Sequence, residues 1–391
     1  MDAAYKGLKV LELARILAGP WIGQTLSDLG AEVIKVESAS GDDTRGWGPP
    51  FVTDADGEPL DAAYFHSANR GKRSIVVDLR SAEGQAVVRR LAAEADVLVE
   101  NFKKDGLKKY GLDYESLKAA NPRLIYVSVT GFGQDGPYSA RAGYDYIIQG
   151  MSGIMDLTGE PEREPQKIGV AFADVFTGLY GTIAVQAALA QREKSGRGQY
   201  IDMALLDAMT SVLANQAQNY FVSGKSPKRL GNAHPNIVPY QVLPAADGPF
   251  IIAAGNDQQF QRFCALLGAP ELSADPRFAT NAARVANREA ATELLSALTG
   301  KMPRDELLAA LEKAGVPGGP INSVEQVFDD PQLQSRGLRV ELPSTGAGAL
   351  SYLRSPLRFS ETELTMERGA PRLGEHTEEV LREIGMEPDE G

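Results

Sequence analysis

The chain has 391 residues, 43% of them hydrophobic and 24% charged, which predicts a soluble globular protein with more than one domain. Its formal net charge of −12 disfavours nucleic acid as a partner. A single cysteine, Cys264, allows no intramolecular disulfide, and three histidines offer little for a metal site, so we expect a cytoplasmic protein without a metal. No signal-peptide pattern opens the chain, and the apolar helical stretch near 180–190 is expected to be too short to cross a membrane.

Short β-rich runs alternate with helix-like stretches over the first 130 residues. The runs expected to form strands are LKVLEL (8–13), AEVIKVE (31–37), SIVVDL (74–79), DVLVEN (96–101) and RLIYVSVT (123–130). Helical patterns lie between several of them, at 21–29, 82–93 and 114–120. Because Val- and Ile-rich strands that alternate with helices usually pair in parallel, this region predicts an α/β fold with a Rossmann-like, doubly wound sheet.

Asp174 lies at a junction between two kinds of local pattern. Before it, apolar residues alternate over 168–172, as in a strand or an extended loop. After it, a helix rich in small residues is expected over 174–192, and the glycines of SGRGQ (195–199) signal its end. A carboxylate at such a junction is either a helix N-cap or a nucleophile, and the local pattern alone favours the cap.

The second half of the chain predicts the domain organisation. A further helix is expected over 201–221, and the basic, turn-rich segment SGKSPKRLGNAHP (223–235) then indicates a domain boundary. Beyond it we expect a hairpin at 238–255 that turns at Asp247-Gly248, helices at 258–267 and 290–311, a linker at 315–322, and strands at 339–343 and 357–360. The expected domains are a large one over 1–222, a small α/β one over 223–335, and a return to the large domain over 336–391.

GFGQDG (131–136) matches the dinucleotide-binding pattern G-x-G-x-x-G directly after an expected strand. That interpretation requires a helix to begin on the glycines, but Pro137 follows at once, and the residue before a proline avoids helical backbone. The segment is better interpreted as a tight glycine loop at the carboxyl edge of the sheet, where the ligand sites of α/β folds usually lie.

Basic residues concentrate in NRGKRS (69–74) and FKKDGLKKYG (102–111), both close to the ends of expected strands. Such runs are usually solvated loops. Lys and Arg also bind phosphate-rich ligands through charge-assisted hydrogen bonds, and local positive charge in an acidic protein favours that second interpretation. Spacing alone does not decide between the two.

Long segments of the chain resemble one enzyme family. They are VLELARILAGPWIGQTLSDLGAEVIKVE, GDDTRGWGPP, NRGKRS, DVLVENF, NPRLIYVSVTGFGQDGPY, AGYDYIIQGMSG, FADVFTGLYG, GQYIDMALLDA, GNAHPNIVPYQV, AAGNDQQF and GVPGGPIN. In this order, over about residues 7–337, they are similar to class III CoA-transferases of the formyl-CoA transferase and carnitine-CoA transferase type. The resemblance implies a Rossmann-like large domain, a smaller α/β domain and a homodimer of two interlocked chains.

The same resemblance implies site residues. Asp174 matches the catalytic aspartate, and Tyr144 matches an aromatic active-site position. Gly133, Gln134 and Asn256 belong to glycine-containing loops expected to line the active site and to offer backbone amides to an oxyanion. The positions that match CoA contacts are Leu17, Ala18, Arg80, Asn101, Phe102, Lys103 and Lys109.

One position departs from the family pattern. Where some members carry an arginine that grips CoA, this chain has Ser38, and Arg45 or Lys72 is a candidate replacement. No tightly bound cofactor is implied, because coenzyme A and acyl-CoA are substrates.

The implied reaction moves CoA from an acyl-CoA to a free carboxylate through a mixed anhydride and an aspartyl-CoA thioester. The aspartate must be ionised to attack, and an ordinary aspartate, with a pKa of about 3.9, is ionised at neutral pH. A helix terminus stabilises that anion further, so the cap and nucleophile interpretations of Asp174 are compatible.

Two alternatives remain open. An α-methylacyl-CoA racemase needs a His and a Glu as acid and base, whereas this chain has Tyr144 and Asn256 at the corresponding positions, neither of which takes up a proton readily at neutral pH. A non-catalytic CoA-binding protein has no need to retain Asp174.

The substrate is expected from the branch that the sequence resembles most. NIVPYQV, AGNDQQF and GVPGGPIN look most like the branch that uses succinyl-CoA and small dicarboxylates such as glutarate. A second carboxylate needs a cation in the pocket, for which Arg15 is the first candidate, followed by Arg45 and His234. The alternative for Arg15 is a surface ion pair with Glu12.

Overall fold

The computed structural model of this chain describes residues 2–386. The chain forms two compact units. The first comprises the N-terminal segment up to Ile154, Lys167–Ala217 and the segment from Gln332 onward, and the second comprises Met155–Gln166 and Gln218–Pro331. Inclusion of the short segment Met155–Gln166 in the second unit is a feature that the sequence pattern does not predict.

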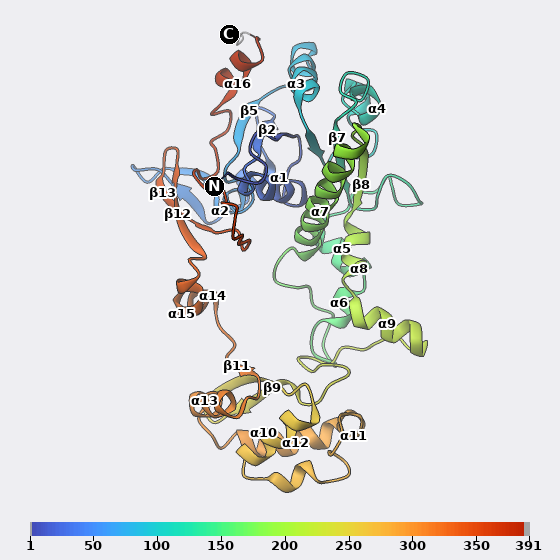
Figure 1. The fold of residues 1–391 in the computed structure, drawn as a ribbon, viewed down its shortest axis with the longest axis vertical. Coiled ribbons are helices and arrows are strands. Elements are labelled where there is room, and N and C mark those ends of the chain that lie inside the picture. Colours follow the sequence, from blue (N-terminus) through green and yellow to red (C-terminus); the bar gives the residue numbers. More distant parts are fainter. Residues whose placement is uncertain (1, 387–391) are drawn as a thin grey trace. The chain divides into compact units, whose positions relative to one another are not determined.

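The first unit is built on a six-stranded sheet in the order β5-β2-β1-β6-β7-β8 (Figure 1). All neighbouring strands in it are parallel, so the α/β class and the parallel sheet are confirmed. The strands are β1 (Lys9–Glu12), β2 (Glu32–Glu37), β5 (Arg73–Val76), β6 (Val97–Glu100), β7 (Ile125–Thr130) and β8 (Tyr200–Ala204).

Strand β8 corrects one expectation, because a helix was the structure expected from residue 201. Tyr126 of β7 pairs with Tyr200, and Thr130 pairs with Ala204, so the run YIDMA completes the edge of the sheet. The alternation of polar and apolar residues in YIDMA is short and an Ala-rich sequence follows it, so the pattern does not distinguish this strand from a helix. Helix α8 (Leu205–Ser211) and helix α9 (Ala214–Ser223) follow it.

Helices cover both faces of the sheet, because successive strand residues point to opposite sides. Val10 belongs to a core cluster formed with α1 (Ala18–Asp28), α5 (Asp145–Met151), α7 (Phe172–Ser195) and α8. Its neighbour Leu11 belongs to another cluster, formed with helices α3 (Ala82–Glu94), α4 (Tyr114–Leu117) and α16 (Thr377–Glu383).

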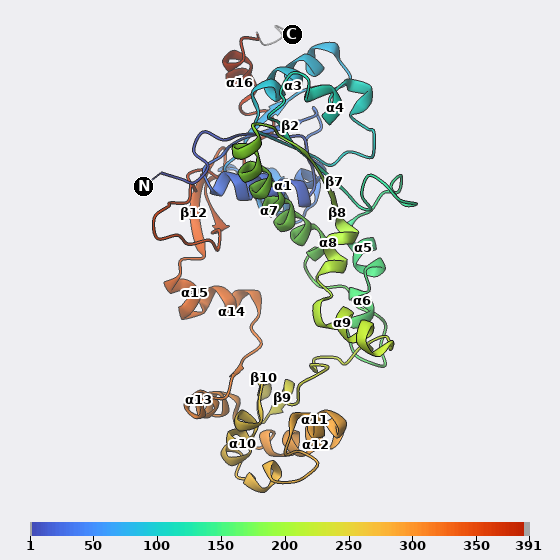
Figure 2. The same ribbon diagram turned by 45° about the vertical axis from the view of Figure 1, so that its right-hand side comes forward.

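Helix α7 packs closely on α1, as Figure 2 shows. A Cβ atom on Gly178 would lie 2.8 Å from the Cβ of Trp21, and one on Gly181 would lie 2.5 Å from Cδ1 of Ile22. The small residues of α7 therefore allow this close packing, since a larger side chain at either position would force the helices apart.

The length of α7 corrects the expectation that this stretch is too short to cross a membrane. With 24 residues, it is long and apolar enough to do so by length and composition. It is the one such helix among residues 2–386, and 44% of its most apolar stretch is buried. A core helix of a soluble protein passes the same test, so this helix alone is weak evidence for a membrane span.

Shorter elements complete the first unit. Residues 339–343 form the expected strand within β12, which pairs with β13. Residues 357–360 form no strand, because no neighbouring strand in the described part of the chain pairs with them. The further elements are η1 (Asp43–Gly46), β3 (Phe51–Thr53), β4 (Pro59–Ala62), α2 (Ala63–His66), η2 (Lys108–Tyr110), α15 (Pro331–Ser335), β12 (Arg339–Ser344) and β13 (Gly348–Leu353).

The second unit packs helices on a small antiparallel sheet around Phe250, Phe260 and Phe263. Its hairpin turns at Ala246-Asp247 rather than at Asp247-Gly248, because Gly248 already pairs with Ala245. The expected helix over 290–311 is two helices, separated at Gly300–Pro303. The elements are β9 (Tyr240–Ala245), β10 (Gly248–Ala253), β11 (Gly318–Gly319), α6 (Ile154–Leu157), α10 (Asp257–Leu266), η3 (Pro270–Ser273), α11 (Asn281–Ala286), α12 (Arg288–Thr299), α13 (Arg304–Ala314) and α14 (Val324–Asp329).

Candidate active site

A cavity of about 420 Å³ opens in the first unit where several strands of the sheet end. This volume lies within the usual range for small-molecule sites, and the carboxyl edge of a parallel sheet is where such sites form. The cavity is lined by the loop after β1, the segment after β6, the glycine loop after β7, and the start of α7. Its lining includes Arg15, Ile16, Ala18, Asp43, Asn101, Phe102, Lys103, Lys104, Lys109, Gly131, Ser139, Arg141, Tyr144 and Asp174.

Asp174 lies in the first turn of α7 but is not its N-cap, which is Ala171. The cap interpretation is therefore corrected. Helix α7 begins two residues earlier than expected because another carboxylate, that of Asp145, accepts a hydrogen bond of 2.8 Å from the backbone N–H of Ala173. Capping by Asp145 leaves the Asp174 side chain available to the cavity.

The Asp174 carboxyl is nearly buried, with 9% of the residue exposed. Burial, and next the negative charge of Asp145, raise its pKa to about 7, although a hydrogen bond from the backbone N–H of Ala18 opposes the rise. The expectation of an ordinary aspartate pKa is therefore wrong for this structure. Close to pH 7, both the neutral and the ionised forms of Asp174 are therefore populated.

The loop that supplies the Ala18 amide is held by buried charge. Ile16 has φ = +73°, a strained conformation for a β-branched residue. Its N–H donates to Asp42, and the buried Lys35 pairs with Asp42 at 2.9 Å. Burial alone would raise the pKa of Asp42, but the pairing with Lys35 and the hydrogen bonds from Thr44 together outweigh burial, and the pKa is lowered. These contacts fix the backbone that approaches Asp174.

Arg15 is fixed at its backbone by Asn101. The Arg15 N–H donates to Asn101 Oδ1 at 2.9 Å, and Asn101 Nδ2 donates to the Arg15 carbonyl at 2.6 Å. The side chain of Arg15 pairs with Asp43 at 2.9 Å, not with Glu12 as the alternative expectation had it. Glu12 is instead buried, where it pairs with Lys35 and Lys72.

Most of the expected CoA contacts lie together in this cavity. Ala18, Asn101, Phe102, Lys103 and Lys109 line it, as do Tyr144 and Arg15. Leu17 is buried next to Ala18 as the N-cap of α1, and it is not part of the lining.

Two further cations of the cavity, Lys104 and Arg141, are not among the expected contacts. The Arg141 guanidinium carbon lies 3.9 Å from the centre of the Tyr138 ring. Lys104 belongs to the basic run 102–111, and Arg141 comes three residues before Tyr144. Proximity to these motifs is a sequence signal that could have found both residues.

Other expected residues lie outside this cavity. Arg80 is exposed and pairs with Asp78, while Gly133 donates its N–H to Thr130. Gln134 lines a neighbouring cavity of about 290 Å³ together with Glu100, and donates through Nε2 to Ser128 Oγ at 2.8 Å.

The proposed replacements for the missing cation at Ser38 are also buried elsewhere. Arg45 is paired with Glu37 and Asp61, both at 2.7 Å, and lies over the Phe65 ring. Lys72 donates to Glu12 and to the carbonyl of Pro20 inside the core. Neither residue therefore replaces the missing CoA-binding arginine in this structure, and the cations that line the cavity are better candidates.

Asn256 and His234 belong to the second unit. Asn256 is the N-cap of α10, and its Oδ1 accepts from the N–H of Gln259. His234 accepts from the N–H of Asn236, and partial burial lowers its pKa, so its ring is neutral at pH 7.

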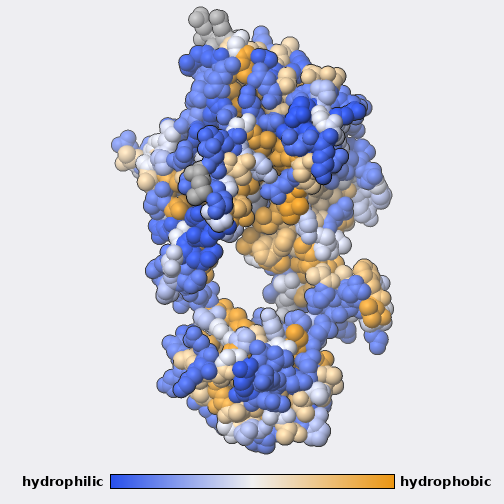
Figure 3. Space-filling view, viewed as in Figure 1, coloured by the Kyte–Doolittle hydropathy of each residue, from blue (hydrophilic) through white to orange (hydrophobic). Residues whose placement is uncertain are grey.

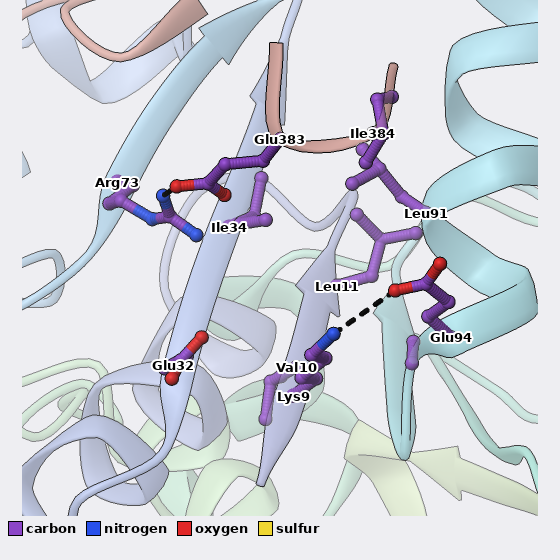
Figure 4. A pocket seen from close by; sticks show the side chains of 11 residues that line it. Lys9, Val10, Leu11, Glu32, Ile34, Arg73, Leu91, Glu94, Glu383 and Ile384 are labelled. Atoms are coloured by element: carbon purple, nitrogen blue, oxygen red, sulfur yellow. Dashed lines mark hydrogen bonds and ion pairs between the residues drawn. The ribbon is translucent and has the colours of Figure 1, made fainter. Parts of the chain in front are cut away.

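A smaller cavity of about 100 Å³ lies on the sheet between α3 and the end of α16 (Figure 4). It is lined by the first residues of three strands, Lys9, Glu32 and Arg73. Lys9 pairs with Glu94 and Arg73 with Glu383 across it. Its place at the amino ends of the strands and its small volume separate it from the cavity around Asp174. Among residues 2–386, no group of three or more His, Cys, Asp or Glu side chains is arranged to hold a metal ion.

A nearly buried carboxylate at the carboxyl edge of a parallel sheet, in a cavity lined by cations, characterises an α/β enzyme with an anionic substrate. Comparison with known proteins identifies the family within this class. The model of CoA-transferase family III matches residues 5–377, and the chain belongs to this family.

Curated relatives and solved structures agree with this assignment. The chain is 59% identical to succinate–glutarate CoA-transferase of Agrobacterium fabrum over 97% of this chain and 95% of that protein. It is 42% identical to human succinyl-CoA:glutarate CoA-transferase over 97% of this chain and 85% of that protein. A CAIB/BAIF family protein from Brucella suis has 63% identity and a TM-score of 0.87, with 98% of this chain and 100% of that chain covered.

Proposed function

We propose that the protein transfers CoA from succinyl-CoA to a small dicarboxylate such as glutarate, with Asp174 as the nucleophile. The observation that carries the proposal is the position of the Asp174 carboxylate in a cavity lined by cations. The names of the relatives from Agrobacterium and human, which match nearly the whole chain, support the choice of donor and acceptor.

The chemistry requires four substitutions at carbonyl carbon. Ionised Asp174 attacks the succinyl thioester, CoA thiolate leaves, and a succinyl-aspartyl anhydride forms. The thiolate then attacks the aspartyl carbonyl and releases succinate. The acceptor carboxylate attacks the resulting aspartyl thioester and releases the thiolate again. Attack of the thiolate on the acceptor carbonyl of the new anhydride gives the product and restores Asp174, so the thioester energy is retained throughout.

Each group in the cavity has a role that follows from its chemistry. The Ala18 amide, which donates to Asp174, holds the carboxylate before attack. Lys103, Lys104, Lys109 and Arg141 supply positive charge for the phosphates of CoA, which offsets the absence of an arginine at Ser38. Arg15 is the candidate partner of the distal carboxylate of a dicarboxylate. Backbone amides of the 131–136 loop, which reaches the cavity at Gly131, are candidate donors to the oxyanion.

Racemase chemistry has less support. Tyr144, at the position where a racemase needs histidine, is 60% exposed at the cavity. Asn256, at the position where a racemase needs glutamate, is engaged as a helix cap. Neither side chain is a proton acceptor near neutral pH.

We also propose that the protein is a cytoplasmic homodimer, with interlocked chains as the family resemblance implies. On α7, the apolar side chains of Leu179, Tyr180 and Ile183 are 41, 42 and 57% exposed. Figure 3 shows hydrophobic surface over the region of α7. An exposed apolar face of this kind favours association. Light-scattering chromatography of the wild-type protein is expected to give twice the mass of one chain, and the mass of a single chain would contradict the dimer.

The activity is tested by incubating the protein with succinyl-CoA and a panel of free acids, and by identifying new CoA esters by mass. Transfer to glutarate without consumption of ATP is expected. Asp174→Ala is expected to abolish transfer while the circular dichroism spectrum is retained. Hydroxylamine added during turnover is expected to modify residue 174 in the wild-type protein. Substantial turnover by the variant, or no adduct on Asp174, would refute the assignment.

A further inference from the structure

Asp145 joins two elements that meet at the active site. It is the first residue of α5, directly after Tyr144, which lines the cavity. Its Oδ1 accepts a hydrogen bond of 2.8 Å from the N–H of Ala173, the residue before Asp174. The described residues that line the cavity do not include Asp145. Its carboxylate therefore contacts the first turn of α7 without lining the cavity.

Gln149 holds this carboxylate in place. It lies one turn further along α5, is fully buried, and donates through Nε2 to Asp145 Oδ2 at 2.7 Å. Its Oε1 accepts from the N–H of Ile168 at 2.9 Å, in the segment that leads into α7. One buried amide thus ties Asp145 and the approach to α7 to the same point on α5.

We propose that Asp145 is a positioning residue for the transfer reaction, which fixes the first turn of α7 and keeps a second negative charge next to the reacting carboxylate. The proposal rests on the proposed function of Asp174 as nucleophile. It goes beyond helix capping, because a neutral acceptor would satisfy the Ala173 amide equally well. A charged acceptor matters because the residue after Ala173 is Asp174, the proposed nucleophile.

The charge has a definite chemical effect. After burial, Asp145 is the second cause of the raised pKa of Asp174. A carboxylate of higher pKa is the stronger nucleophile once it is ionised, but a smaller fraction is ionised at acidic pH. Other ionisable groups near Asp174 are Tyr64 of α2, whose own pKa is raised to about 12 by burial and by Asp174 and Asp145, and the cavity-lining Arg15, Asp43, Lys103, Lys104, Lys109, Arg141 and Tyr144.

Two substitutions separate the charge of Asp145 from its hydrogen bond. Asp145→Asn keeps an oxygen for the Ala173 amide and removes the charge. The acidic limb of kcat/KM for succinyl-CoA is then expected to move down by about one pH unit, so the ratio of activity at pH 6 to that at pH 8 rises about fivefold. At pH 8, kcat is expected to fall while KM for succinyl-CoA stays constant, because Asp145 does not face the cavity. Asp145→Glu keeps the charge and is expected to keep the wild-type limb.

A matched control comes from the second unit. Asp247 Oδ1 accepts from the N–H of Arg304, the first residue of α13, at 2.7 Å. Asp247→Asn removes a charge from a comparable helix start in the other unit, and is expected to leave the pH profile unchanged.

The outcomes are decisive in each case. A wild-type limb in folded Asp145→Asn, or a limb moved equally by Asp247→Asn, would overturn the proposal. If Asp145→Asn does not fold, a limb displaced by more than half a pH unit in Asp145→Glu would overturn it instead. Absence of transfer by the wild-type protein would refute the proposed function and this inference with it, whereas transfer by the wild type together with an unchanged limb in Asp145→Asn would refute this inference alone.

Discussion

Arg15 donates through Nη1 to the carboxylate of Asp43 at 2.9 Å, and both side chains line the cavity that contains Asp174. Their backbones are anchored by one buried residue. Asp42 accepts from the N–H of Ile16, which follows Arg15, and from the N–H of Thr44, which follows Asp43. The pair is therefore held at the cavity and differs from a mobile surface contact. Asp43 also presents a carboxylate to Arg15, which is the same kind of group that a dicarboxylate substrate would offer.

Arg15→Ala is expected to raise KM for glutarate about tenfold, which corresponds to about 1.4 kcal/mol, with a much smaller effect on a monocarboxylate of similar length. The reason is that only the dicarboxylate has a distal group for the guanidinium to bind. Initial rates with succinyl-CoA and each acid provide the comparison. Arg277→Ala is the matched control, because Arg277 pairs with Asp275 in the second unit. Equal losses for both acids would remove Arg15 from substrate recognition.

Asp43→Asn is expected to act in the opposite direction. The Arg15 and Asp43 side chains are 50 and 51% exposed, and an exposed ion pair contributes about 0.2–1 kcal/mol. Removing the competing carboxylate should therefore lower KM for glutarate by about 1.4- to 5-fold, and only while Arg15 is present. The measurement is a double-mutant cycle with Arg15→Ala, in which Asp275→Asn is the control. A higher KM in Asp43→Asn would show that Asp43 orients Arg15 and does not compete with substrate.

The local sequence pattern predicts the parallel sheet well and the carboxylate contacts poorly. Strands β1, β2, β5, β6 and β7 are recognisable because each is a short Val- or Ile-rich run bounded by turn residues. Strand β8 is not, since its five residues lie between a long helix and an Ala-rich segment. A single-strand pattern of that length is ambiguous until its pairing partner is known.

The sequence could not predict which side chains pair across the fold. Arg45 and Lys72 belong to polar, turn-rich segments that suggest exposure, yet both are buried, where Arg45 pairs with Glu37 and Lys72 pairs with Glu12. The same limit applies to Asp174. Its neighbours in sequence suggest a helix cap, but the capping carboxylate comes from Asp145, 28 residues away from Ala173, and contacts of that kind depend on tertiary structure.

The raised pKa of Asp174 predicts a pH dependence of the reaction. Only the ionised carboxylate attacks, so kcat/KM for succinyl-CoA is expected to rise with pH and to level off above the pKa of about 7. Activity at pH 6 should be about one-tenth of that at pH 8. Initial rates between pH 5.5 and pH 9 at constant ionic strength test this. A profile that stays flat down to pH 5.5 would mean that Asp174 is ionised like an ordinary aspartate.

Glu100 offers a stability test that is independent of the reaction. Burial raises its pKa to about 7, from 4.5 for the free side chain, although the N–H of Phe102 donates to its carboxylate at 2.7 Å. Because the folded pKa is above the unfolded value, its contribution to stability is fully present below pH 4.5 and is lost as the pH rises through about 7.

Glu100→Gln has no charge to bury, so its stability relative to the wild type is expected to improve between pH 5 and pH 8. The gain between pH 5 and pH 8 is on the order of 2–3 kcal/mol. Urea midpoints for the first unit, followed by the fluorescence of Trp21 and Trp47, measure this trend. Glu94→Gln is the control, since Glu94 is exposed and its pKa is lowered by Lys9, so its removal should produce no gain with pH. A constant difference between Glu100→Gln and the wild type across this range would show that Glu100 is already ionised in the fold at pH 5.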